Sequence, residues 1–160
     1  MRAEFERIVE RLKEAGGKKA VIVGIGNVLK GDDGAGAVIC ERIKDKITAD
    51  VIDAGTVPEN YIQKIAKQSP EIVLVIDAID FGASTGDLKI LKPEDLSSTI
   101  TSTHSLSPRI FARLLSQQAN AKVFFIGIQP KQVQLGTPLS EEVSKSVDVL
   151  VEILVSVFKK

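Results

Sequence analysis

The stretch IVLVIDAID, residues 72–80, is the strongest strand signal in the chain and decides the fold. Apart from two aspartates it is continuously apolar and rich in β-branched residues, which is typical of a strand buried on both faces of a parallel sheet. We therefore expect this strand at the centre of a sheet. Its two acids, Asp77 and Asp80, stand at its carboxyl end.

On either side of this strand, apolar runs alternate with segments of helical period. Strands are expected at 20–26, 51–55, 72–80, 87–91 and 122–128, and helices at 2–15, 34–46, 58–67, 105–118 and 140–158. This alternation predicts a three-layer α/β/α fold with a twisted, mostly parallel five-stranded sheet. The alternating pattern of DLKIL, residues 87–91, predicts a half-exposed edge strand that runs antiparallel to the rest.

The size and composition of the chain limit the classes of protein to consider. Its 160 residues suit one domain, 1–160, in which residues 1–17 carry an extra amphipathic helix. Lys plus Arg and Asp plus Glu both number 21 and Trp is absent, so the basic surface and stacking aromatics of a nucleic-acid-binding protein are missing. A single cysteine, Cys40, suits a reducing compartment and is interpreted as core filling. With no signal peptide or membrane span in the pattern, we expect a cytoplasmic protein.

Acidic side chains follow several of the expected strands. In open α/β sheets, sites form beyond the carboxyl ends of the strands. The residues expected to meet there are Asp32, Asp33, Asp53, Asp77, Asp80 and the only histidine, His104. We therefore predict that five acids and one imidazole converge.

Such a cluster of carboxylates requires something that relieves its repulsion. Two carboxylates about 5 Å apart repel by roughly 3 kcal/mol at an effective dielectric constant near 20. A shared proton or a divalent cation would relieve this repulsion, and the nearby imidazole favours the cation. Oxygen and nitrogen ligands together suit zinc, nickel or iron better than calcium or magnesium.

Each of these residues also has a purely structural interpretation. Asp53 and Asp77 could cap the turns that follow their strands, and Asp32 could make the GDDG turn. His104 could be a hydrogen-bonded structural histidine. Gln129, which follows the last strand, could belong to a turn or could line the crevice.

Two other kinds of site remain open at this point. A dinucleotide fingerprint would need glycine where Leu29 stands, and the acid pair would repel a pyrophosphate. A receiver-like phosphoacceptor or magnesium-binding signalling domain could use Asp32, Asp33 and Asp77 around magnesium. In receivers, however, the acid pair stands directly at the strand end, whereas here it lies six residues beyond Gly26.

Five segments in order give the sequence a family resemblance. They are GIGNVLKGDDGAG, VIDAGTVPEN, VIDAIDFGASTGDLKI, TSTHSLSP and FFIGIQP, within a resemblance that covers roughly residues 19 to 155. With these motifs the chain resembles the nickel-iron hydrogenase maturation endopeptidases, most closely the type associated with formate hydrogenlyase. The family fold is a twisted, mostly parallel five-stranded sheet between helices, in agreement with the pattern above.

The resemblance implies an enzyme that removes the C-terminal extension of a nickel-iron hydrogenase large-subunit precursor after nickel insertion. Its motifs place the metal ligands on Asp33, Asp77 and His104, and they include Asp53, which we take with Asp77 as catalytic. Nickel would be supplied by the substrate, and zinc or another adventitious cation could bind in its absence. The enzyme itself would be a monomer.

The resemblance also gives the glycine-rich turn a function. Glycines let a backbone approach a bound polypeptide closely. Substrate-binding residues are therefore expected at Gly31, Asp32, Gly34, Gly36 and Gln129. Cleavage would proceed by polarisation of the scissile carbonyl or a water, or mainly by positioning a strained precursor tail.

Overall fold

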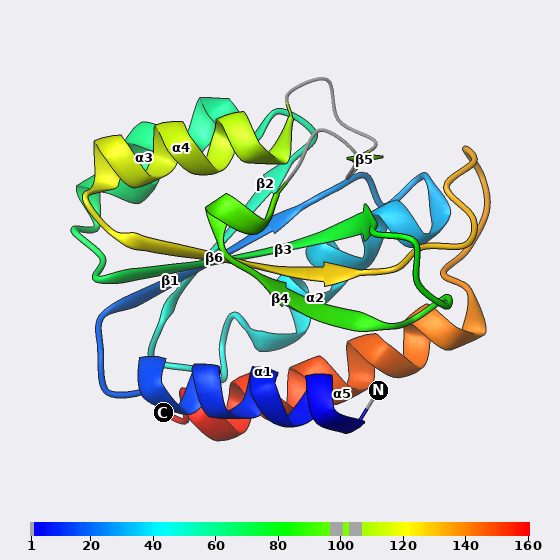
Figure 1. Ribbon diagram of the computed structural model, residues 1–160, viewed down its shortest axis with the longest axis horizontal. Helices are drawn as coiled ribbons and strands as arrows, with labels where there is room; N and C mark the ends of the chain where they lie inside the picture. The colour runs from blue at the N-terminus through cyan, green and yellow to red at the C-terminus, as the bar shows by residue number, and fades with distance from the viewer. Residues whose placement is uncertain (1, 97–100, 103–106) are drawn as a thin grey trace.

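The computed structural model describes residues 2–96, 101–102 and 107–160, and for residues 2–5, 101 and 102 it describes the backbone alone. Within these parts of the chain, a central sheet lies between two layers of helices (Figure 1). No helix among them is long and apolar enough to cross a membrane.

The sheet has five main strands in the described part of the chain, in the order β2-β1-β3-β6-β4. Their bounds are β1 (Ala20–Ile25), β2 (Asp50–Gly55), β3 (Ile72–Asp80), β4 (Leu88–Leu91) and β6 (Lys122–Ile128). The first three and β6 are parallel, whereas β4 pairs antiparallel with β6 at the edge. The predicted α/β/α fold, with β3 at the centre and an antiparallel edge strand, is therefore confirmed.

Helices cover both faces of this sheet. The α-helices are α1 (Arg2–Ala15), α2 (Ala35–Ile43), α3 (Ile62–Lys67), α4 (Pro108–Ala119) and α5 (Glu141–Val157), and short 3-10 helices occur at η1 (Gly31–Gly34), η2 (Pro58–Tyr61) and η3 (Pro93–Asp95). Helices α3 and α4 lie over one face, and α1, α2 and α5 lie over the other (Figure 1).

Two local features differ from the sequence prediction. Helix α4 begins at Pro108 rather than at residue 105, because the hydroxyl oxygen of Ser107 accepts a hydrogen bond from the Ile110 amide at 3.2 Å and proline occupies the first turn. A two-residue strand, β5 (Thr101–Ser102), was not expected and pairs antiparallel with the end of β3. Two residues are too few to produce a periodic pattern.

The central strands separate two apolar cores by simple alternation. In β3, Leu74 and Ile76 belong to a core shared with α1, α2 and α5, whereas Val73, Val75 and Ile79 belong to a core shared with α3 and α4. Successive residues of a strand point to opposite faces, so Asp77 points to the α3/α4 face.

Glycines allow α2 to pack unusually close to β1. A Cβ atom at Gly24 would lie 2.5 Å from the Cys40 sulfur and 2.5 Å from the Gly36 carbonyl oxygen. A Cβ atom at Gly36 would in turn lie 2.6 Å from the Ile76 carbonyl oxygen. Helix α2 therefore lies directly on the backbone of the sheet and sets the position of η1, which precedes it.

We expect Gly24→Ala to lower the free energy of unfolding by about 1–3 kcal/mol, because the added methyl group overpacks the interface between β1 and α2. Chemical denaturation followed by circular dichroism measures this change. Gly17→Ala is the matched control, since a Cβ atom at Gly17 meets nothing within 4 Å. Equal stability of the two variants would contradict the close packing described here.

Candidate active site

The acid pair of the GDDG turn is buried in η1 at the end of β1. Asp33 is 2% exposed, and its Oδ2 atom accepts a hydrogen bond from the Asn27 amide at 3.0 Å. Gly26, with a φ of 139°, lies against the Asp33 carbonyl, where any Cβ atom would overlap it. Glycine at this position therefore allows η1 to fold back over the end of β1.

Asp77 lies on the central strand and is also buried, with 1% exposure. It stands opposite Gly127 of β6 in the parallel register. Since β1 is the other neighbour of β3 and η1 packs against β3, Asp33 and Asp77 lie at the carboxyl ends of adjacent strands. The structure thus places two of the three expected metal ligands in one region.

The third expected ligand, His104, lies outside the described residues. The described chain before it ends with Ser102, which pairs with Ile79, two residues beyond Asp77. The described chain after it resumes with the helix cap Ser107. The Asp33, Asp77 and His104 set therefore stays a prediction.

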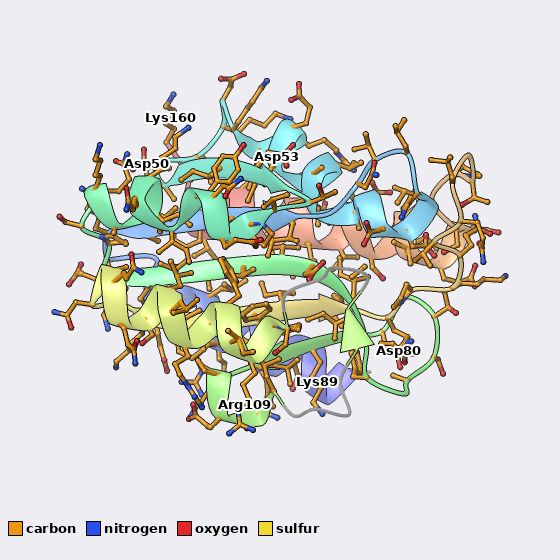
Figure 2. All side chains as sticks on the ribbon, turned by 90° about the horizontal axis from the view of Figure 1, so that it is seen from above. Asp50, Asp53, Asp80, Lys89, Arg109 and Lys160 are labelled. Atoms are coloured by element: carbon orange, nitrogen blue, oxygen red, sulfur yellow. The ribbon has the colours of Figure 1, made fainter. Side chains whose placement is uncertain are left out.

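The predicted convergence of five acids is not found. In the parallel register Asp53 aligns with Gly24, which in turn aligns with Ile76, so the Asp53 side chain points to the α2 face, opposite to Asp77. Asp53 is exposed, and its carboxylate accepts a hydrogen bond from the Gly55 amide at 3.1 Å. Asp53 and Asp80 lie well apart in Figure 2. Within the described residues, no three His, Cys, Asp or Glu side chains are grouped so that they could hold a metal ion.

Asp32 has a structural role that the sequence did not reveal. It is 0% exposed, and its carboxylate accepts hydrogen bonds from the amides of Lys131, Gln132 and Ser140 at 2.9, 3.1 and 2.6 Å. The Ser140 hydroxyl donates a fourth, at 2.9 Å. This carboxylate joins η1 to the loop after β6 and to Ser140, the N-cap residue of α5, so its side chain is engaged by the protein itself, and substrate binding by Asp32 stays a prediction.

The glycines expected to bind substrate are closely packed against other parts of the chain, and substrate binding by them stays a prediction. Gly31, Gly34 and Gly36 are buried. A Cβ atom at Gly34 would lie 2.7 Å from the Val28 Cα, and one at Gly31 would collide with the Gln132 carbonyl oxygen and with Thr137. These two glycines therefore let loop backbones approach one another closely.

Gln129 likewise organises the turn that follows β3. Its side-chain oxygen accepts hydrogen bonds from the amides of Phe81 and Ala83 at 2.9 and 3.1 Å, and its side-chain nitrogen donates to Asp80 at 3.0 Å. This amide and the Gly82 backbone amide lower the pKa of the Asp80 carboxyl below its usual value. Gln129 is 6% exposed and has this structural role, whereas its contact with substrate stays a prediction.

Cys40 is buried in α2, as expected for core filling. Burial, together with the negative charge of Asp53, raises the pKa of its thiol to about 12. A thiol with this pKa is almost entirely protonated at neutral pH and is a poor nucleophile.

Large apolar residues on the loops around the acid pair were not predicted as functional from the sequence. Val28, Leu29 and Leu135 are 61%, 63% and 72% exposed. The available signal was the presence of large apolar residues within turns that are otherwise rich in glycine and polar residues.

Comparisons with known proteins agree on one family. The family model described as hydrogenase maturation protease matches residues 37–157. The hydrogenase 3 maturation protease of Escherichia coli K12 is 31% identical over 80% of this chain and 83% of its own. The crystal structure of the NiFe hydrogenase maturation protease HycI from Thermococcus kodakarensis KOD1 is similar with a TM-score of 0.82 and 35% identity, over 92% of this chain and 97% of the other. The structure of the NiFe hydrogenase maturation protease HybD from Thermococcus kodakarensis is also similar, with a TM-score of 0.73 and 29% identity, over 88% of this chain and 99% of the other.

We expect Asp32→Ala to lower the free energy of unfolding by about 3 kcal/mol, because three backbone amides and one hydroxyl lose a buried charged acceptor. Denaturant titration measures the loss. Asp148→Ala is the control, because its ion pair with Arg42 is exposed and is worth at most about 1 kcal/mol. Equal losses in the two variants would show that the Asp32 network is not a major support of the fold.

Proposed function

The chain belongs to the hydrogenase maturation protease family, and on this premise we propose that it is an endopeptidase for the precursor of a nickel-iron hydrogenase large subunit. It removes a C-terminal extension once nickel has been inserted into the precursor. Family membership leaves no support for the receiver-like alternative.

The observation that carries the proposed mechanism is the pair of buried carboxylates, Asp33 and Asp77, at the ends of adjacent strands. Two carboxylates in a region of low dielectric constant favour the approach of a divalent cation. We assign nickel, carried by the precursor, as that cation, and His104 as the third ligand. The enzyme would thereby recognise a precursor whose metal site is complete.

A set of two oxygens and one nitrogen also explains why the metal would come with the substrate. Without thiolate ligands such a set binds nickel only modestly, so the enzyme alone would hold little metal or an adventitious ion such as zinc. Nickel held between precursor and enzyme would polarise the scissile carbonyl or a water.

We assign proton transfer in this reaction to Asp77. Asp53, the other candidate from the sequence, points to the opposite face of the sheet. The single histidine of the chain leaves no HExxH motif for a conventional zinc protease, and we propose a metal-dependent, carboxylate-assisted type instead.

Processing should depend on nickel in the precursor. We expect the protein to shorten nickel-loaded precursor and to leave nickel-free precursor intact, because only the former presents a cation to Asp33 and Asp77. Intact-protein mass spectrometry measures the loss of the C-terminal extension. Equal shortening of both forms would refute recognition of the metal, although the peptidase activity would stand.

The three assigned ligands should each be essential. Asp33→Asn, Asp77→Asn and His104→Ala are expected to lower the rate of processing by at least about 100-fold, because each removes a charged or nitrogen ligand. The control is Asp50→Asn, an exposed residue at the start of β2, which should keep the full rate. Circular dichroism must show the same fold in all four. A folded variant of an assigned ligand that processes at the normal rate would remove that residue from the site.

A further inference from the structure

The large apolar side chains exposed on the described part of the molecule lie at the end of the sheet where the parallel strands have their carboxyl ends. They are 41–72% exposed, and they are Val28, Leu29, Val57, Ile110 and Leu135. Four of them lie in loops that follow the carboxyl ends of strands. The fifth, Ile110, lies in the first turn of α4, and this helix begins at the same end of the sheet (Figure 1). A grouping of exposed apolar residues beside a candidate site commonly marks an interaction surface.

Three of these side chains, Val28, Leu29 and Leu135, stand on two loops that are joined by their backbones. We call them the apolar platform. The Gly136 amide donates to the Leu29 carbonyl oxygen at 2.8 Å, and the Asp32 amide donates to the Gln132 carbonyl oxygen at 2.7 Å. The Asn27 side-chain oxygen accepts from the Leu29 amide at 2.9 Å. The two loops therefore support each other.

This bracing keeps the apolar side chains in water instead of letting them collapse onto the core. The Asp32 carboxylate accepts hydrogen bonds from Lys131 and Gln132 at the base of the second loop. Gly34 lets the Val28 backbone lie directly on η1. A surface already held in one conformation loses little conformational entropy when a partner covers it.

We propose that the apolar platform is the docking surface for the large-subunit precursor, an inference that rests on the proposed function. The platform is continuous with the site, because Asp33 follows Asp32 directly, and Asp32 ties η1, which follows the first platform loop, to the second platform loop. A metal ion or a short tail at the site would not cover three side chains on two loops. A folded polypeptide that delivers its nickel to Asp33 would cover them.

The charges around the platform indicate the chemistry of the surface that fits it. Lys30, next to Leu29, is exposed and takes part in none of the ion pairs found among the described residues. Lys131 is also exposed, and its ammonium lies 3.8 Å from Glu142. Since Lys131 already has an acidic neighbour, Lys30 carries the charge argument, and the matching surface of the precursor is apolar at its centre and acidic where it faces Lys30. Such rim charges accelerate association most at low ionic strength.

The test compares kinetics of nickel-loaded precursor with wild-type protein and with the double variant Leu29→Ser, Leu135→Ser. Because the platform binds the precursor and does not touch the reacting bond, the double variant should raise KM by at least about tenfold and leave kcat unchanged. Methionine at both positions should recover most of the loss, since it restores apolar surface. Lys18→Ser is the control, because Lys18 is exposed and precedes β1, at the amino end of that strand and away from the platform.

Each outcome decides between the two proposals. A raised KM with unchanged kcat and an unchanged unfolding midpoint supports the platform. Normal KM in the double serine variant overturns the docking proposal and leaves the proposed function intact. Failure of the wild-type protein to process or bind any nickel-loaded precursor overturns the proposed function, and the docking proposal falls with it.

Discussion

The hydrogen bonds to the buried carboxylate of Asp32 are the interaction on which the loops at the carboxyl end of the sheet depend. A charge without access to water is tolerated only when hydrogen-bond donors surround it, and here three backbone amides and the Ser140 hydroxyl do so. Those donors come from a segment about 100 residues further along the chain. One side chain thereby ties η1 to the loop after β6 and to the start of α5.

The two neighbouring aspartates consequently have different tasks. Asp32 is directed into the protein and holds the loops, which gives Asp33 a defined position at the end of β1. The glycines on either side serve the same end, because they let η1 lie against the backbones of β1 and of the loop after β6. A functional carboxylate in a turn needs this kind of support, since a loop alone positions a side chain poorly.

Much of the architecture could be predicted because it follows from local patterns. The apolar run of β3 and the alternation in residues 87–91 indicated the central strand and the antiparallel edge strand, and both are found. Among site residues, the positions of Asp33 and Asp77 at adjacent strand ends followed from the same rule for parallel sheets. Asp53 was misplaced because a strand-end position does not say which face a side chain takes.

The sequence by itself determined the class of fold, the acidic residues at the carboxyl ends of the strands, and the family. Periodicity and ordered motifs are properties of the chain alone. Only the tertiary structure decided the roles of Asp32 and Gln129 and the exposure of Leu29 and Leu135. The physical reason is that these hydrogen bonds and this burial depend on contacts between segments that are about 50 to 100 residues apart in the sequence. No local pattern records which distant backbone amide will face a given carboxylate.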